Sequence, residues 1–292
     1  MSFNESYRAY QKTFEHALSE YLDELDCTPQ ILKDSMVYSV ELGGKRFRPV
    51  LMLAVGELLG VKTEDVMPFA IALELIHTYS LIHDDLPGMD NDDFRRGKPS
   101  NHKVFGEGNA ILAGDALLNT AFEIVLKECM KSHDHIQAAR FLAYCAGIHG
   151  MICGQSADML FSAKPDYEEE DLLFIYENKT GKLIKAACEI PAILAGGKYL
   201  LEFEEFSSVL GVLFQLTDDI LDEESSLEEL GKSVGKDKAQ DKLTAIKIYG
   251  LPACKAKVDL LVAEGCQLLE GLPFKDTLFL KETLEYIQNR KN

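Results

Sequence analysis

The residues best suited to chemistry are the carboxylates in the stretch from His77 to Arg96. Asp84 and Asp85 end an apolar helical pattern, Asp90 follows soon after, and the stretch closes on two arginines. Carboxylates packed together repel and raise one another's pKa, so a hydrophobic core gains nothing from them. A divalent cation relieves that repulsion, because hard cations take oxygen ligands. The stretch therefore predicts a metal site beside arginines suited to phosphate.

A second acidic cluster, Asp218-Asp219 with Asp222, also ends a long apolar helical pattern. Asp218 and Asp222 are four residues apart and so share one face of a helix. Their charges disfavour the C-terminal end of that helix, where the dipole prefers cations. An exposed acidic helix end explains most single clusters of this kind. The repetition of the pattern is more specific than either cluster alone and favours a shared metal-binding function.

Cations gather in residues 43–49 (Gly-Gly-Lys-Arg-Phe-Arg-Pro), between two predicted helices. The glycines suit the end of one helix, and Pro49 suits the first turn of the next. Free N–H groups and the dipole at such an N-terminus favour an anion. Taken alone, the stretch fits a basic surface loop equally well, but the carboxylate motif favours an anion site.

Composition limits the class of protein. The chain has 292 residues, 47% of them hydrophobic, and a net charge of −18. This acidity argues against nucleic-acid binding, which needs a basic surface. The seven cysteines are scattered and form no C-x-x-C pair, which indicates reduced thiols rather than disulfides or a zinc site. We find no signal-peptide pattern and no uninterrupted apolar run of about 20 residues, and we expect a cytoplasmic protein without a membrane span.

A hydrophobic period of 3.6 residues extends along nearly the whole chain, so we expect an all-α fold. The predicted helices cover about residues 5–25, 29–42, 50–59, 64–86, 108–130, 136–161, 171–195, 202–222, 243–250, 254–271 and 276–289. Gly150 and Gly154 indicate close helix packing. No linker or repeat interrupts the pattern, which predicts one domain over residues 1–292.

Other polar residues fall within these helical patterns. His77 lies two turns before Asp84 on one stripe of the predicted helix 64–86, whereas His83 carries no signal of its own. Lys179 and Thr180 face either solvent or a polar pocket. Residues 223–242 are rich in charge, Ser and Gly. This composition fits either a disordered tether or a lid that brings positive charge to phosphate.

Taken together, the motifs resemble those of the trans-isoprenyl diphosphate synthases, most closely the bacterial farnesyl diphosphate synthases. The resemblance spans residues 43 to 242 in family order. It rests on residues 43–49, His77, Asp84-Asp85-x4-Asp90 with Arg95-Arg96, Lys179-Thr180, Phe214-Gln215-x2-Asp218-Asp219-x2-Asp222 and a glycine-lysine segment ending at Lys242. It implies a single large antiparallel helical bundle around a central cavity, of the isoprenoid synthase type, and a homodimer.

The resemblance also implies a reaction. Isopentenyl diphosphate would condense head-to-tail with dimethylallyl or geranyl diphosphate to give farnesyl diphosphate and diphosphate. Three Mg²⁺ ions, which Mn²⁺ can replace, would bridge the allylic diphosphate and allow its C–O bond to ionise. The implied metal ligands are Asp84, Asp90 and Asp218, with Asp85 and Asp222 in support.

Further residues take roles by their position in the family motifs. The site for the allylic substrate would contain Arg95, Lys179, Thr180, Gln215, Lys232 and Lys242. Of these, Thr180, Gln215 and the Lys179 carbonyl would present dipoles to the allylic cation. Isopentenyl diphosphate would be held by Lys45, Arg48, His77 and Arg96. Residues 235–242 carry more lysines than the family pattern, which leaves open which lysine contacts the diphosphate.

Helix geometry predicts what limits product length. Tyr79 lies five residues before Asp84, about 7–8 Å back along a helix axis, where a bulky ring can form the floor of the cavity. Tyr79-Ser80, with two extra residues in the first aspartate motif, resembles the farnesyl-length pattern. An ordinary packed tyrosine is the alternative. We also expect Pro87-Gly88 to break the helix so that Asp90 returns towards Asp84.

Four alternatives compete with this interpretation. A geranylgeranyl or longer-chain synthase would share every motif and differ only at the cavity floor. A non-catalytic partner subunit of a heteromeric prenyl synthase would have lost aspartates, and none is missing here. A terpene cyclase would have no use for an isopentenyl site. A metal-storage helical bundle would need Glu-x-x-His pairs.

Overall fold

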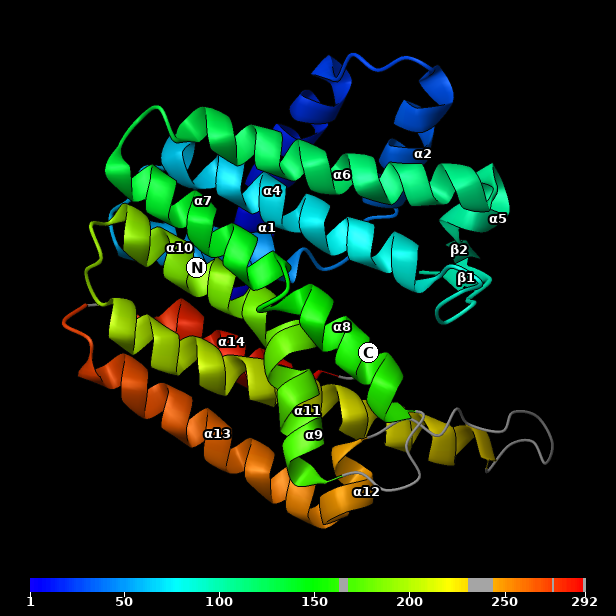
Figure 1. Ribbon diagram of the computed structural model, residues 1–292. Coiled ribbons are helices and arrows are strands. Elements are labelled where there is room, and N and C mark those ends of the chain that lie inside the picture. The colour runs from blue at the N-terminus through cyan, green and yellow to red at the C-terminus, as the bar shows by residue number, and fades with distance from the viewer. Residues whose placement is uncertain (163–167, 231–243, 275, 291–292) are drawn as a thin grey trace. The chain divides into compact units, whose positions relative to one another are not determined.

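Figure 1 shows the computed structural model of the chain, which describes residues 1–162, 168–230, 244–274 and 276–290. The chain is 79% helical, and the expected all-α class is confirmed. The helices are α1 (Phe3–Glu24), α2 (Gln30–Glu41), α3 (Phe47–Leu58), α4 (Thr63–Asp84), α5 (Asn101–Phe105), α6 (Glu107–Glu128), α7 (His133–Ala146), α8 (Met151–Ser162), α9 (Glu169–Ile175), η1 (Tyr176–Gly181), α10 (Lys182–Leu194), α11 (Leu200–Leu230), α12 (Ala245–Tyr249), α13 (Leu251–Gly271) and α14 (Leu278–Asn289). A short hairpin pairs β1 (Phe94–Arg95) with β2 (Lys98–Pro99).

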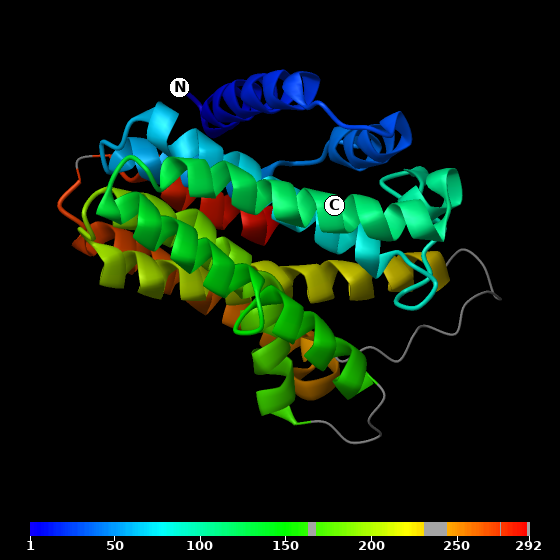
Figure 2. The same cartoon turned by 45° about the horizontal axis from the view of Figure 1, so that its top comes forward.

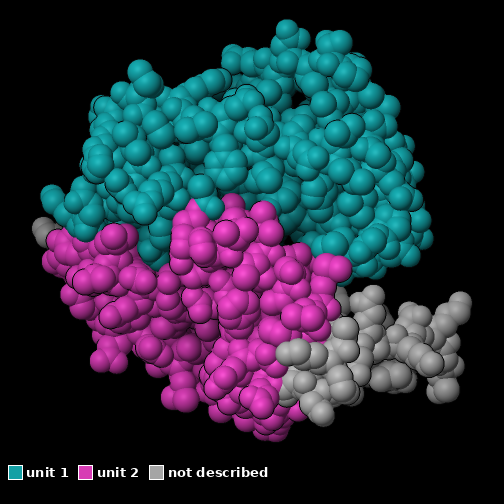
Figure 3. Space-filling view, viewed as in Figure 1, with its two compact units in different colours: residues 1–143, 186–198 teal, residues 144–185, 199–292 magenta. Residues whose placement is uncertain are grey.

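The chain forms two compact units (Figure 3). Unit 1 comprises residues 1–143 and 186–198, and unit 2 comprises residues 144–185 and 199–292. The first aspartate motif and the basic stretch 43–49 belong to unit 1. Lys179 and the second aspartate motif belong to unit 2. The prediction of one domain over residues 1–292 stays a prediction.

Helix α4 forms the centre of unit 1. It packs most extensively against α6, which runs alongside it in Figures 1 and 2, and also against α3. Its side chains are buried all round, including Phe69, Leu73 and Ile76, as expected for a helix enclosed by neighbours. Helices α4 and α6 are long and apolar enough to cross a membrane, but 67% of the apolar window of α4 is buried inside the protein. That burial is the ordinary property of a core helix.

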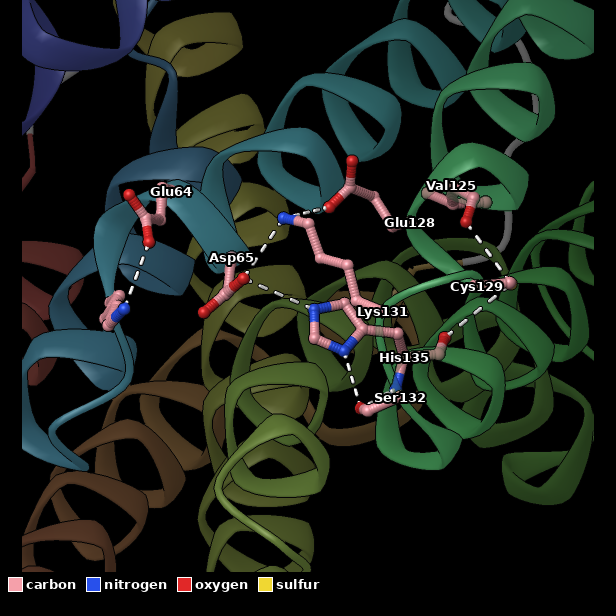
Figure 4. A network of polar contacts seen from close by, with 9 residues as sticks. Glu64, Asp65, Val125, Glu128, Cys129, Lys131, Ser132 and His135 are labelled. Atoms are coloured by element: carbon pink, nitrogen blue, oxygen red, sulfur yellow. Dashed lines mark hydrogen bonds and ion pairs between the residues drawn. The ribbon is translucent and has the colours of Figure 1, made fainter.

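The N-terminal end of α4 is fixed by a polar network (Figure 4). The Asp65 carboxylate lies 3.1 Å from Lys131 Nζ and 3.5 Å from His135 Nε2. The other ring nitrogen of His135 is 2.8 Å from Ser132 Oγ. These contacts join α4 to the turn between α6 and α7 and to the first turn of α7. The opposite end of α4, which carries the aspartate motif, therefore projects from an anchored helix.

Helix α11 forms the centre of unit 2, packed against α13, α14 and η1. Its buried side chains recur at helical spacing, as in Phe203, Phe206, Leu210 and Leu213, so one stripe faces the core. Helices α13 and α14 approach closely at Gly265, where a Cβ would lie 2.8 Å from a Leu284 methyl carbon.

Three predicted helices differ from the structure. The prediction of one helix over 136–161 was wrong, because the chain turns between α7 and α8. A Cβ at Gly150 would lie 2.0 Å from the Cys145 carbonyl oxygen, so this glycine serves the turn. The predicted helix 171–195 comprises α9, the π-helix η1 and α10. The predicted helix 202–222 continues to Leu230, so the second aspartate motif lies within α11 rather than at its end.

Candidate active site

The first aspartate motif stands where α4 ends. The helix stops at Asp84, and the Asp90 backbone N–H donates a hydrogen bond to the Asp84 carbonyl oxygen at 2.8 Å. The Asn91 N–H closes the same turn on the Leu86 carbonyl at 3.1 Å. The predicted helix break at Pro87-Gly88, with the return of Asp90 towards Asp84, is confirmed. The turn brings together the backbones of two residues that a continuous helix would hold about 9 Å apart along its axis.

Asp85 is buried and engaged by the protein. Its residue is 2% exposed, and Arg95 Nε donates to its Oδ1 at 3.0 Å while Arg95 Nη2 bonds to the same oxygen. Burial raises the pKa of the Asp85 carboxyl, against the opposing effect of the Arg95 cation. The bond to Asp85 in turn raises the pKa of Arg95. The buried carboxylate thus fixes the guanidinium that the β1–β2 hairpin carries.

The predicted isopentenyl diphosphate site also comes together in unit 1. Arg48 Nη1 lies 3.5 Å from His77 Nε2. The Arg96 guanidinium lies against the backbone of Gly44, where a Cβ would be 2.7 Å from Arg96 Cζ. A side chain at position 44 would displace the guanidinium. The glycine therefore joins Arg96 to the basic stretch 43–49, 52 residues earlier in the chain.

His77 is a neutral group among cations. Burial holds the pKa of its imidazole well below the usual 6.5, and the charges of Arg48, Arg96, Arg46 and Arg95 lower it further. A neutral imidazole keeps one ring N–H to donate. Burial likewise lowers the pKa of Arg96. An anion bound here would compensate the repulsion among the guanidinium groups, which is the property expected of a diphosphate site.

Arg46 of the same basic stretch has a structural function. Its residue is 4% exposed, and it bonds to Glu15 and Glu74, each at 2.8 Å. Neither partner was predicted from the sequence. Glu74 and His77 also form a Glu-x-x-His pair of the kind that a metal-storage bundle uses. Because Glu74 is held by Arg46, this pair gives no support to the metal-storage alternative.

Helix α1 holds the basic stretch from outside. The Tyr7 hydroxyl donates to the Lys45 carbonyl at 2.8 Å, and Gln11 Nε2 donates to the Gly44 carbonyl at 3.2 Å. A pocket lies among the C-terminal ends of α2 and α4, the β1–β2 hairpin and the start of α5. Its lining consists of Ser39, Leu42, Thr78, Leu81, Ile82, Asp85, Arg95, Arg96 and Asn101. Asp85 and two of the predicted diphosphate-binding arginines therefore face one pocket.

Tyr79 is buried on α4, one turn before His83. Its residue is 5% exposed, and burial, with the nearby Asp84 charge, raises the pKa of its phenol to about 12. The hydroxyl is buried and has no hydrogen-bond partner among the described residues. Ser80 is half-buried, and its hydroxyl donates to the His77 carbonyl at 2.9 Å. The Tyr79 side chain therefore acts through the bulk of its ring and not through a hydrogen bond of its hydroxyl.

In unit 2, Asp218 projects from the middle of α11 towards the C-terminal segment. Its carboxylate bonds to the Arg290 guanidinium. That guanidinium also stacks at 4.2 Å on the Phe214 ring and donates to the Phe214 carbonyl at 2.8 Å. Asp222 is exposed one turn further along α11. The contact with Arg290 was missed, because nothing in the sequence links a C-terminal arginine to a distant aspartate.

Asp219 is fixed by two hydrogen bonds. Its Oδ2 accepts from the Tyr176 hydroxyl and, at 2.6 Å, from the Ala245 backbone N–H. Burial raises the pKa of this carboxyl to about 6, helped by the neighbouring Asp222 and Asp218 charges. One carboxylate therefore ties α11 to η1 and to the start of α12.

The predicted residues Lys179 and Thr180 lie in η1, and a π-helical turn of this kind is frequent at functional sites. Lys179 Nζ forms an ion pair with Asp158 of α8. A Cβ at Gly154 would lie 2.1 Å from the Lys179 backbone nitrogen. The close packing predicted for Gly154 is therefore confirmed.

Helix η1 also packs against α11, where a Cβ at Gly211 would lie 3.1 Å from the Cα of Gly181. Gln215 follows one turn later on α11 and, like Thr180, is half-buried. Lys179, Thr180, Gln215 and Asp218 thus lie on two helices that contact each other.

The carboxylates of the first motif fit a hard divalent cation. Asp84 and Asp90 are half-buried, offer oxygen ligands, and are brought together by the backbone bond between them. Within the described residues, no group of three or more His, Cys, Asp or Glu side chains is already arranged to hold a metal ion. Phosphate oxygens and water would supply further ligands, as they generally do at Mg²⁺ sites. Lys232 and Lys242 lie outside the described residues.

Comparison with known proteins gives a consistent result. Residues 29–264 match the polyprenyl synthetase family. The chain is 44% identical over 275 residues to the farnesyl diphosphate synthase of Bacillus subtilis, which covers 92% of both proteins. It is 43% identical over 268 residues to a chloroplastic geranylgeranyl pyrophosphate synthase of Capsicum annuum, covering 90% of this chain and 73% of that protein. The solved structure of a geranyltransferase from Legionella pneumophila has a TM-score of 0.87 at 32% identity, covering 99% of this chain and 97% of that one.

Proposed function

This chain belongs to the polyprenyl synthetase family and is a trans-prenyltransferase, and we propose that its product is farnesyl diphosphate. It would condense isopentenyl diphosphate head-to-tail with dimethylallyl or geranyl diphosphate and release diphosphate. The position of Tyr79 supports this product length. Its buried ring lies on α4 five residues before Asp84, about 7–8 Å along the helix axis. A growing chain that runs beside α4 from Asp84 would stop there.

Isopentenyl diphosphate would bind at the basic group of unit 1. Arg48, His77 and Arg96 are already gathered there, and Lys45 belongs to the same stretch. A neutral His77 donates one N–H without adding charge, while the arginines supply the fixed positive field. The substrate's double bond would then be held ready to attack the allylic carbon.

The allylic diphosphate would bind at the aspartate motifs. Prenyl synthases generally use divalent metal ions, and we propose Asp84, Asp90 and Asp218 as ligands of three Mg²⁺ ions, with Asp85 and Asp222 in support. Bound Mg²⁺ would neutralise charge on the leaving diphosphate so that the C–O bond can ionise. Asp85 would act by holding Arg95, which binds the diphosphate as a bidentate donor.

Further residues are proposed to bind the allylic substrate. Lys179 would bind the diphosphate, and Lys232 and Lys242 would add charge. Thr180, Gln215 and the Lys179 carbonyl would turn dipoles towards the allylic cation. An apolar cavity would exclude water, which would otherwise capture the cation. The released diphosphate would accept the proton lost in the final step.

Two alternatives predict different outcomes. The geranylgeranyl pyrophosphate synthase of Capsicum annuum is almost as similar to this chain as the farnesyl diphosphate synthase of Bacillus subtilis. Overall sequence identity therefore does not decide the length of the product, which depends on the residues of the cavity floor. A non-catalytic partner subunit would be inactive alone, but every aspartate of both motifs is present. We further propose a cytoplasmic homodimer that acts on small diphosphates and, at a net charge of −18, binds no nucleic acid.

The test is product analysis of the purified chain with Mg²⁺, labelled isopentenyl diphosphate and each allylic primer in turn. We expect C15 product from dimethylallyl and geranyl diphosphate, no extension of farnesyl diphosphate, and no product with a chelator. Efficient extension of farnesyl diphosphate to C20 would favour the geranylgeranyl alternative. Inactivity with all primers would favour the non-catalytic subunit.

A further inference from the structure

His83 occupies a notch in the neighbouring helix α6. A Cβ on Gly114 would lie 2.1 Å from His83 Nε2, 2.5 Å from Cδ2 and 2.9 Å from Cε1. No side chain larger than hydrogen fits at position 114 while the imidazole stays there. The same Nε2 lies 3.0 Å from the Ile111 carbonyl oxygen, so the tautomer with a proton on Nε2 donates to that carbonyl. The ring is therefore fixed both by shape and by a hydrogen bond.

The imidazole in turn supports the ring of Tyr79. The two ring centroids are 5.7 Å apart with an interplanar angle of 81°, which is the favoured edge-to-face arrangement. The Tyr79 hydroxyl has no hydrogen-bond partner among the described residues, so hydrogen bonding does not fix the phenol. Packing alone orients the Tyr79 ring, and His83 provides an aromatic part of that packing.

We propose that His83, held in the Gly114 notch, is a positioning residue that sets the place of the Tyr79 ring and thereby the length of the product. The proposal rests on the proposed function, because it takes Tyr79 as the cavity floor. His83 directly precedes Asp84 in the chain. The turn of α4 from Tyr79 to Asp84 would thus be anchored to α6 at one point. That anchor would hold constant the distance between the ionising diphosphate and the floor.

The first experiment compares two substitutions of the same kind on α6. Gly114→Ala places a methyl group where the imidazole lies, so His83 must leave its position. Gly108→Ala is the matched control, because a Cβ there meets no atom within 4 Å. Loss of an aromatic pair corresponds to about a two- to tenfold change in a ratio of products. We expect Gly114→Ala to change the C20:C15 ratio by that factor, towards C20, and Gly108→Ala to leave it unchanged.

A further variant, His83→Ala, separates positioning from folding. His83→Ala removes the ring without adding bulk to the α4–α6 contact, and should also raise the C20 fraction. If Gly114→Ala does not fold, His83→Ala alone decides. A purely structural function for His83 would lower the melting temperature without changing the product ratio. Unchanged ratios in His83→Ala, and in Gly114→Ala where it folds, would overturn the proposal.

Tyr79→Ala, together with the unsubstituted protein, distinguishes failure of this proposal from failure of the floor assignment and of the proposed function. If Tyr79→Ala lengthens the product but the His83 and Gly114 variants do not, only the positioning proposal fails. If Tyr79→Ala leaves C15 unchanged, the floor lies elsewhere, and both the floor assignment of Tyr79 and the positioning proposal fail while farnesyl diphosphate stays the product. Failure of the proposed function itself would appear in the unsubstituted protein, as a C20 product or as no product. In the double variant Tyr79→Ala/Gly114→Ala, the second substitution should add little, because the ring that it displaces is already absent. Additive changes in the product ratio would contradict an effect exerted through Tyr79.

Discussion

In the first aspartate motif the buried Asp85 bonds to an arginine, whereas in the second motif Asp219 accepts from a tyrosine hydroxyl and a backbone N–H. In both motifs the second aspartate of the Asp-Asp pair thus bonds to a neighbouring element of the protein. Asp85 fixes the hairpin that carries Arg95, and Asp219 fixes η1, which carries Lys179. The second aspartate of each pair thus holds an element that carries a residue proposed to bind substrate, whereas Asp218, a first aspartate, bonds to Arg290, which has no proposed substrate contact. We infer that the first aspartate serves the metal and the second holds the residues that bind substrate.

The two motifs also reach their third carboxylate differently. In unit 1 the helix stops, and a turn returns Asp90 to the Asp84 carbonyl. In unit 2 the helix continues, and Asp222 follows Asp218 by the period of α11. A break gives the first motif a geometry that depends on Pro87-Gly88. In the second motif, the spacing of Asp218 and Asp222 follows from the helical period of α11.

The largest effect is expected from the first aspartate of each pair. Asp84→Asn or Asp218→Asn removes the charge of a proposed metal ligand while preserving size. Loss of one oxyanion-hole donor already costs about 10²–10³-fold in rate, so we expect a loss of about 10³-fold or more in kcat. Steady-state assays measure this, and circular dichroism should show an unchanged helical fold. Turnover near the wild-type rate in either variant would refute the proposed metal ligands.

An intermediate effect is expected for Asp85→Asn. The amide can still accept one hydrogen bond, but the ion pair with Arg95 is lost. Groups that orient a metal ligand or a substrate contact typically contribute about 10- to 100-fold in activity. We expect a loss in that range, with KM for the allylic diphosphate raised because Arg95 is no longer fixed. A loss as large as that of Asp84→Asn would place Asp85 on the metal.

A small effect is expected for Asp219→Asn. Both hydrogen bonds converge on one oxygen, Oδ2, and the carbonyl oxygen of an asparagine can accept both. We expect a change of only a few fold in kcat/KM. Asp219→Ala, which removes the acceptor, should lose more activity. Equal losses in the two variants would show that charge rather than hydrogen bonding matters at position 219.

His77 of unit 1 and Asp219 of unit 2 should change the stability of the folded protein in opposite directions as the pH falls. His77 has a lowered pKa in the folded state, so the unfolded chain binds more protons below about 6.5, and stability falls as the pH falls below that value. The pKa of Asp219 is raised to about 6, so its contribution is present below about 3.9 and is lost as the pH rises through 6.

Melting temperatures of the metal-free protein from pH 4 to 7.5 test these signs. His77→Gln should reduce the loss of stability at low pH. Asp219→Asn should weaken the opposite trend between about pH 4 and 6, by a few degrees. Identical pH profiles of the wild type and both variants would contradict the assigned protonation states.

Much of the first site could be predicted from the sequence. Carboxylates, arginines and a helix break lie within 20 residues there, so local rules apply directly. The return of Asp90 depends on chain stiffness over six residues and was predicted correctly. That Arg96 lies against the basic stretch 43–49 could be inferred only from the resemblance to the family. It depends on a tertiary contact with Gly44, which no local pattern encodes.

The second site was predicted less completely for a physical reason. Hydrophobic periodicity gives helix type but not the place where a helix ends, so α11 was predicted to end eight residues early. The interruption between α7 and α8 depends on the contact between Gly150 and the Cys145 carbonyl. The π-helical turn at Lys179 and the contacts of Tyr176 and Arg290 join residues far apart in the chain. Sequence spacing carries no information on these contacts.

The number of metal ions bound by variants of the two Asp-Asp pairs decides whether the first and second aspartates have different functions. Mn²⁺ bound in the presence of a non-ionising allylic diphosphate analogue can be counted by electron paramagnetic resonance, without any turnover. We predict that Asp84→Asn and Asp218→Asn lose bound Mn²⁺, whereas Asp85→Asn and Asp219→Asn retain the wild-type number of ions. An equal loss of bound Mn²⁺ in all four variants would contradict the inference that the first aspartate of each pair binds metal and the second does not.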